Sequence, residues 1–481
     1  MLQVDNFEAK TYGALRLISS FRNLLQPLNR LPPEALSRII RHVPNEQDTD
    51  ARVIVVLTHV CRYWREFIIS TPWNWTLISS RSEGLAALSL QRAKAAPLEM
   101  CIDMDEVKKT PGFCDLINPF IQSTKTLSFD KFIKVKELTR TLPDFPRSMP
   151  NLQSLTLDGA RRTDQVEVNS GDLFESLTPT LRYLNLSHFP LYPSFFRLRA
   201  LTELTLHTHY FNLHLDTLLD FLEENRSLKS AILGIDFTES SLLSSRRGAA
   251  IANQLQRLSI PTGETGKALI SNIALRRGAH LVIDSNSYKG LYDLLSGVST
   301  AHLLNLSSPT FMEYQSHGYD RSIRLLGPSG SFLFRKSYSS KNVFEEFPVL
   351  PLTNFREFRF IFQGLEWGTM FNPSFFPALE IFAAQGRIWG SGPLSTLLSN
   401  PSSPPSLKTL AFSNCNLSGN FMEGLTLFAS NRKNTTSALL RRVVIVDSKE
   451  NLPSVDSMDA LGKHVPIVDV RIGKELPTDL T

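Results

Sequence analysis

A short apolar phrase that returns along most of the chain limits most strongly how this protein can fold. The phrase is one apolar residue, two other residues, a second apolar residue, one other residue and a third apolar residue, and its copies lie about 20 to 30 residues apart. A single copy cannot bury its own apolar side chains, so neighbouring copies must stack and share one core. The clearest copies are Leu152-Leu155-Leu157, Leu181-Leu184-Leu186, Leu201-Leu204-Leu206, Leu255-Leu258-Ile260, Phe355-Phe358-Phe360, Leu379-Phe382-Ala384 and Leu407-Leu410-Phe412.

Weaker copies extend the pattern in both directions. The same spacing also describes one face of an amphipathic helix, but the phrases are followed by helix breakers, as at Ser187-His188-Phe189-Pro190. We therefore interpret each phrase as a short strand. The weaker copies are Leu127-Phe129, Leu228-Ala231-Leu233, Leu281-Ile283, Ala301-Leu304-Leu306, Leu440-Val443-Ile445 and Val465-Val468-Val470. Leu98-Met100-Ile102, which alternates by two, is interpreted as an opening strand.

The phrase and its period resemble those of leucine-rich repeats. The resemblance implies an α/β solenoid over residues 81–473, with one strand per coil in a curved parallel sheet and returning helices such as 215–224 and 264–277. The repeats are irregular, because most lack the family's Asn and only Asn414 stands at the matching place. Residues 307–322 and 336–353 fit the repeat poorly, and residues 474–481 are predicted to be a frayed tail.

Strand alternation predicts which side chains point away from the core. The second and third apolar residues of each phrase point inward, so their neighbours share the opposite, concave face. Solenoids build extended binding surfaces on such faces, and the mixture of aromatic, charged and hydroxyl groups suits a protein target. The predicted target-binding residues are Tyr183, Asn185, Glu203, Thr205, His207, Arg257, Ser259, Glu357, Arg359 and Ile361.

The N-terminal part has a different pattern, which predicts three short helices. The first begins at the proline pair Pro32-Pro33, because proline suits the first helical turn, and Pro44 ends it. Asp48, Thr49 and Asp50 resemble the cap of a second helix. The third carries Val60 and Trp64 on one face, and Thr71-Pro72 ends it.

These N-terminal residues resemble the F-box, whose pattern is Leu-Pro-x-Glu, an aliphatic pair, and Val-x-x-x-Trp-Arg. Leu31-Pro32-Pro33-Glu34, Ile39-Ile40 and Val60 to Arg65 match it, and Pro72 to Trp75 resembles the Pro-x-x-Trp that follows the box in fungal members. The polar insertion 45–50 departs from the short family linker. We place the box at residues 28–80, after an N-terminal helix or linker at 1–27.

The F-box resemblance implies binding to the small Skp adaptor, which bridges to a cullin scaffold. The chain would then be the substrate receptor of an SCF-type ubiquitin ligase, with no catalytic residues, cofactor or metal of its own. A non-ligase scaffold with the same box and repeats is the alternative, and an enzyme with an unrecognised site is a third class. The expected adaptor-binding residues are Leu31, Pro32, Glu34, Leu36, Ile39, Ile40, Val60 and Trp64.

Composition limits the classes of binding partner and the cellular compartments that we expect for this chain. The formal charge of the 481 residues is only +5 and basic residues occur in pairs rather than runs, which argues against nucleic acid as a partner. No stretch is apolar enough for a membrane span, and no secretory signal is visible. The four cysteines show neither metal spacing nor a disulfide framework, so we expect the cytosol or nucleus.

Two local motifs fail as sites. Gly263 to Ala268 resembles a phosphate loop, but the first glycine is replaced by Pro261 and Ala268 lacks the metal-binding hydroxyl. His207, His209 and His214 have no defensible zinc spacing.

Overall fold

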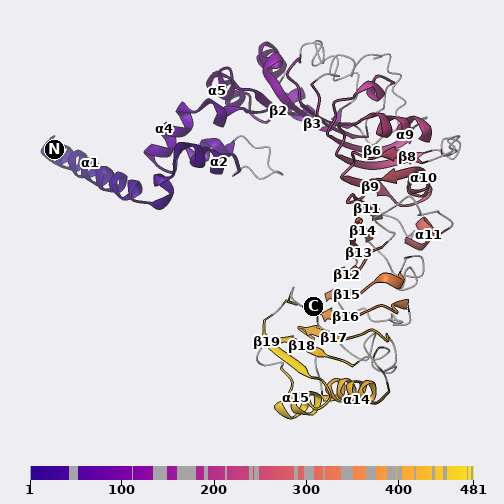
Figure 1. Ribbon diagram of the computed structural model, residues 1–481. Coiled ribbons are helices and arrows are strands. Elements are labelled where there is room, and N and C mark those ends of the chain that lie inside the picture. The colour runs from indigo at the N-terminus through magenta and orange to yellow at the C-terminus, as the bar shows by residue number, and fades with distance from the viewer. Residues whose placement is uncertain are drawn as a thin grey trace. The chain divides into compact units, whose positions relative to one another are not determined.

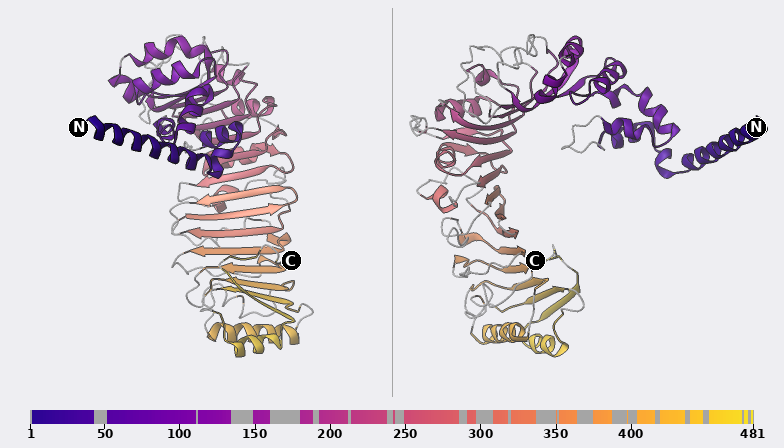
Figure 2. Two further views of the ribbon diagram at one scale, coloured as in Figure 1. Left: turned by 90° about the vertical axis from the view of Figure 1, so that its left-hand side faces the viewer. Right: turned by 180° about the vertical axis from the view of Figure 1, so that it is seen from behind.

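The described residues of the computed structural model place seventeen strands in one large, mostly parallel sheet that is flanked by helices and not closed into a barrel, an α/β fold (Figure 1 and Figure 2). By their contacts, residues Met1–Thr208 and His209–Thr481 form two compact units. The structure describes residues 2–42, 52–110, 112–133, 149–159, 180–188, 193–211, 214–237, 242, 249–285, 291–296, 308–317, 320–336, 350, 352–363, 375–386, 397, 404–415, 419–435, 439–447, 452–473, 475–477 and 480.

The first unit begins with helices, in the order α1 (Leu2–Leu24), η1 (Pro27–Arg30), α2 (Pro33–His42), α3 (Arg52–Leu57), α4 (Arg62–Ser70) and η2 (Pro72–Trp75). The predicted start at the proline pair and the predicted end at Thr71-Pro72 are confirmed. Val43, Pro44 and the predicted cap at 48–50 lie outside the described residues. Val60 lies in the turn between α3 and α4, with its N–H on the Leu57 carbonyl, and not in the third helix as predicted.

Two tryptophans fix how these helices pack. Trp64 is buried in α4 and donates its indole N–H to Asn29 Oδ1 at 2.6 Å. Trp75 is buried beneath Arg92 and donates to the Ile68 carbonyl at 2.8 Å. Each indole thus has the partner that a buried N–H requires, and each links two helical segments.

Six parallel strands follow in sequence order: β1 (Leu77–Ser79), β2 (Leu98–Asp103), β3 (Thr124–Ile133), β4 (Ser154–Gly159), β5 (Tyr183–Ser187) and β6 (Glu203–Phe211). Leu127, Leu155, Leu184 and Leu204 pair at one level of the ladder and are all buried. The chain returns between strands through α5 (Glu83–Ala93), α6 (Met104–Lys109), α7 (Phe113–Ile117), η3 (Asn118–Ser123) and η5 (Pro193–Arg197). The predicted phrases in this unit therefore lie on parallel strands, one for each return.

The second unit contains eleven strands of the large sheet among its described residues. Two groups are parallel and run in sequence order: β7 (Ser230–Phe237), β9 (Arg257–Pro261) and β11 (His280–Ser285), and then β15 (Glu357–Gln363), β16 (Ile381–Gln385), β17 (Thr409–Ser413), β18 (Arg442–Asp447) and β19 (Ile467–Ile472). The helices among its described residues are α9 (Leu215–Glu224), α10 (Glu264–Asn272), α11 (Leu291–Leu295), η8 (Leu352–Asn354), α14 (Gly419–Thr435) and α15 (Val455–Gly462). Helix α9 has the predicted bounds.

An antiparallel insertion separates these two groups. Strands β12 (Phe311–His317), β13 (Asp320–Gly327) and β14 (Gly330–Lys336) form a meander, in which β14 pairs with β11 and β12 pairs with β15, both in parallel. The spatial order is therefore β11-β14-β13-β12-β15, and two of the three strands run in the direction of the rest. Much of 307–322, which fits the repeat poorly, is β12 and the start of β13.

The second unit differs from the sequence predictions in the length of one helix. The helix predicted over 264–277 ends at Asn272, because residues 273–275 form β10 (Ile273–Leu275), which pairs with β8 (Ala250–Ala252) in a separate two-stranded sheet. The phrase at 301–306 lies outside the described residues. Phenylalanine in the later phrases has a packing reason, since Phe358 stacks on Phe376 at 5.4 Å and meets Phe382 edge-on at 5.8 Å.

Candidate functional site

The helices between residues 28 and 75 leave several large apolar side chains exposed. Ile39 of α2 and Val60 are 38% and 56% exposed, although both belong to the motif that predicted the helices. Single exposed apolar residues are common, but six within one small helical segment favour a partner surface. The full set is Leu28, Ile39, Val56, Val60, Ile69 and Trp73.

The eight predicted adaptor-binding residues divide into an exposed or half-buried group and a buried group. Pro32, Glu34, Ile39 and Val60 are exposed, and Leu31 is half-buried. Leu36, Ile40 and Trp64 are buried. As adaptor contacts, Leu31, Pro32, Ile40 and Trp64 are expected to be partly exposed in the isolated chain. For Ile40 and Trp64 this expectation is wrong, because Leu36 and Ile40 are one helical turn apart on the inner face of α2 and Trp64 is fixed by Asn29.

In the first unit, the ladder brings the predicted target-binding residues together on one face. Tyr183 pairs with Glu203, Asn185 with Thr205, and Ser187 with His207 on the adjacent strands β5 and β6. The burial pattern of β5 alternates between these positions and the buried leucines. We call the side of the sheet opposite the leucines the open face.

Sequence reasoning missed the acidic residues that continue this open face. Asp130 of β3 pairs with Asp103 of β2, and Glu99 lies at the level of Thr126. Asp130 and Asp158 each follow the third apolar position of a phrase, which is the signal that alternation offered. Among the described residues, no group of three His, Cys, Asp or Glu side chains could hold a metal ion.

In the second unit, the register separates the predicted residues into two places on the open face. Arg257 and Ser259 are on β9, and four strands (β11, β14, β13 and β12) lie between them and Glu357, Arg359 and Ile361 of β15. At about 4.8 Å per strand this separation is roughly 24 Å. These five residues therefore do not form one compact site.

Local contacts further limit what these side chains can bind. Ser259 is buried and donates to Asp284 Oδ2 at 3.1 Å. Arg359 donates to Glu357 Oε1 at 2.6 Å, and its guanidinium lies 5.5 Å from the Phe311 ring centroid. A pair with this geometry is already satisfied, so it contributes little free charge to the face.

The open face of β16, β17 and β18 carries an apolar cluster, which the sequence analysis did not foresee. Ile381, Ala383, Ala411, Val444 and Val446 form a buried cluster that includes Leu480, and Leu476 packs against it. Residues 474–481 were predicted to fray, yet Leu480 is only 1% exposed. The signal was the unbroken apolar run 443–446, because a strand buried on both faces loses its alternation.

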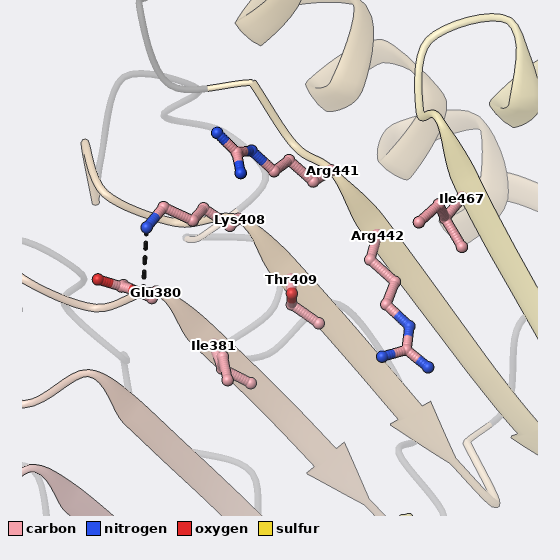
Figure 3. Close-up of a pocket in the computed structure, with 7 residues that line it drawn as sticks. All are labelled: Glu380, Ile381, Lys408, Thr409, Arg441, Arg442 and Ile467. Carbon is pink, nitrogen blue, oxygen red and sulfur yellow. Dashed lines mark ion pairs between the residues drawn. The ribbon is translucent and has the colours of Figure 1, made fainter. Parts of the chain in front are cut away.

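A pocket of about 470 Å³ adjoins this cluster where strands β16 to β19 begin (Figure 3). Its lining is rich in cations, and Lys408 is paired with Glu380 at 3.1 Å. Exposed Arg441 has no ion pair with any described residue. The lining residues are Glu380, Ile381, Lys408, Thr409, Arg441, Arg442 and Ile467.

Asp469 of β19 forms an ion pair with Arg442, the second arginine that lines this pocket. It accepts hydrogen bonds from Arg471 at 2.9 Å and from Arg442 at 3.0 Å, which hold the pKa of its carboxyl below the ordinary range. Asp469 therefore stays ionised, and its single negative charge is shared between Arg442 and Arg471. Arg441 adds a further positive charge to the lining of the pocket.

The segment from Gly263 to Ala268 has a structural role, and the histidines at 207, 209 and 214 do not all lie on one element. A Cβ on Gly266 would lie 2.0 Å from the Pro261 carbonyl oxygen, so glycine lets α10 pack closely on the end of β9. Thr265 accepts a hydrogen bond from the Phe237 N–H at 3.1 Å. His207 lies on β6 and His214 directly precedes α9, while the His209 side chain is outside the described residues.

The cysteine thiols are free in the described residues. Burial raises the pKa of Cys415 to about 12, and that of Cys101 on the open face of β2 to about 12. Neither thiol is activated as a nucleophile.

Comparison with known proteins gives no relative for this chain: no family model matches it, and neither does any curated protein. Across the described helices, none has the length and apolar character needed to cross a membrane.

Proposed function

We propose that the chain is the substrate-recognition subunit of an SCF-type ubiquitin ligase. Helices α2 to α4 form an F-box that binds the Skp adaptor, and the strands form a leucine-rich-type solenoid whose open face binds a target protein. One observation supports this most directly. The F-box pattern spans three short helices and the turns beside them, and its members Pro32, Ile39 and Val60 are exposed.

The division within the motif gives each residue a physical role. Leu36, Ile40 and Trp64 hold the helices together, so that the exposed members are presented in a fixed arrangement. Large apolar side chains that a small helical segment leaves exposed are stabilised when a partner covers them. This arrangement is what an adaptor-binding module requires.

In this role the chain acts by proximity. The conjugating enzyme supplies the reactive thioester, and the receptor raises the effective concentration of a target lysine beside it. The chain itself then needs only two binding surfaces, one for the adaptor and one for the target.

The first test measures binding of the purified Skp adaptor to the full chain by isothermal titration calorimetry. Ile39→Glu combined with Val60→Glu places two charges where the adaptor would cover apolar surface, so we expect affinity to fall at least 100-fold. Leu31→Ala combined with Pro32→Ala should also abolish capture in a pull-down.

The matched control is Leu427→Glu, since Leu427 is a similarly exposed apolar residue on α14 in the second unit. It should leave adaptor affinity unchanged, and circular dichroism melting should show that all variants stay folded. Folded Ile39→Glu/Val60→Glu chain with full adaptor affinity would disprove the proposed F-box.

A further inference from the structure

The strongest unexplained feature lies on the open face of β16 to β18. We call Ile381, Ala383, Ala411, Val444 and Val446 the tail-binding face. The register places them on the opposite side of the sheet from the core residues Phe382, Leu410 and Val443, so the main core does not bury them. They are buried because Leu480 and Leu476 of the C-terminal tail cover them.

The C-terminal tail begins next to this face. After β19 ends at Ile472, the N–H of Gly473 donates to the Asp447 carbonyl at 3.2 Å. A Cβ at Gly473 would lie 3.2 Å from Val446 Cγ1, so the absence of a side chain lets the tail pass close to the strand.

The tail contributes apolar side chains to this face, since Leu480 belongs to the buried cluster and Leu476 packs against it. Its sequence from Glu475 to Leu480 contains two leucines and two acidic residues. Ala383 and Ala411 are small, which leaves room above the sheet for leucine side chains. Ile381 belongs both to the face and to the pocket that contains Lys408 and Arg441, so apolar and basic groups adjoin (Figure 3).

We propose that the tail-binding face and the adjoining basic pocket bind an extended, acidic, leucine-anchored segment of the target, and that the chain's own tail is an internal competitor for this site. The tail shows which side chains the face accepts, and Arg441 supplies a positive charge that selects acidic neighbours. A target segment binds when it displaces the tail. This deepens the proposed receptor function and rests on it for the identity of the ligand as a target segment.

The test uses a fluorescent peptide with the sequence of residues 474–481 and reads its binding by anisotropy. The protein is the full chain, compared with the Leu476→Ser/Leu480→Ser variant, whose tail no longer competes. A tethered tail acts at an effective concentration in the millimolar range. We therefore expect the peptide to bind the variant at least tenfold more tightly than the unaltered chain.

Specificity is tested by substitutions in the peptide and by substitutions in the protein. A peptide with both leucines replaced by serine should not bind, and one with Glu475→Lys and Asp479→Lys should bind more weakly. Adding Arg441→Glu to the tail variant should weaken binding of the original peptide about threefold to tenfold. Arg277→Glu, at an exposed arginine before β11, is the matched control and should have no effect.

Several results would overturn the proposal. These are equal affinity for the two proteins, no binding to the tail variant, or equal binding of the leucine and serine peptides. A chain ending after Gly473 is the second tail-free protein, and thermal melting shows whether each is folded. Adaptor binding is measured separately, so failure here is distinguishable from failure of the proposed F-box.

Discussion

Arg432 of α14 shows how much one side chain can contribute to the second unit. It is fully buried, and its guanidinium donates to the carbonyls of Pro404, Pro405 and Leu407 at 3.0, 3.3 and 3.0 Å. Burial lowers the pKa of this group, and the Phe428 ring lies 5.5 Å from it. Arg432 therefore ties the helix to the turn that enters β17.

Arg432→Met tests this role, because methionine keeps most of the volume and removes all three donors. Leaving buried carbonyls without partners should lower the free energy of unfolding by about 2 to 4 kcal/mol. Urea denaturation measures the change. Lys433→Met, at the exposed neighbouring cation, should stay within about 0.5 kcal/mol, and an equally small loss for Arg432→Met would contradict the assignment.

At the scale of elements, the sequence predicted the parallel strands because their apolar positions repeat in register. Leu258, Phe358 and Leu410 each fall on a buried ladder position, as the phrase predicts. The helix α9 was predictable because Leu218, Leu219 and Leu222 lie on one face.

The meander β12 to β14 escaped prediction because its apolar residues alternate by two, as at Ile323-Leu325 and Phe332-Phe334, and do not form the phrase. Antiparallel strands need no returning helix, so the period of the repeat also disappears.

The adaptor-binding site was only partly predictable from the sequence. The motif did not distinguish exposed Ile39 from buried Ile40, and burial of Trp64 depends on Asn29, which lies 35 residues away.

Strand β6 offers a direct test of the alternation on which the target-binding prediction depends. Leu204 is 1% exposed and lies in the leucine ladder, so Leu204→Ala should cost roughly 2 to 5 kcal/mol of unfolding free energy. Thr205→Ala changes the next residue, on the open face, and should cost less than about 0.5 kcal/mol. Comparable costs at both positions would contradict the assigned faces.

For the whole molecule, the account assigns adaptor binding and target binding to separate surfaces. Substitutions at Ile39 and Val60 should abolish adaptor binding and leave target binding intact, whereas Arg441→Glu should leave adaptor binding intact and weaken target binding about threefold to tenfold. A scaffold that uses the adaptor outside any ligase would show the same two binding activities. Only recruitment of the cullin and modification of the target distinguish the two functions.

The most direct measurement is affinity purification of the full chain from its native cells with the proteasome blocked. The account predicts that the adaptor and a cullin co-purify with the chain, together with a ubiquitinated protein. All three should keep their association in the Leu427→Glu control, and the adaptor and cullin should be lost with Leu31→Ala/Pro32→Ala. Recovery of the adaptor without any cullin would contradict the ligase function, and recovery of neither would contradict the F-box itself.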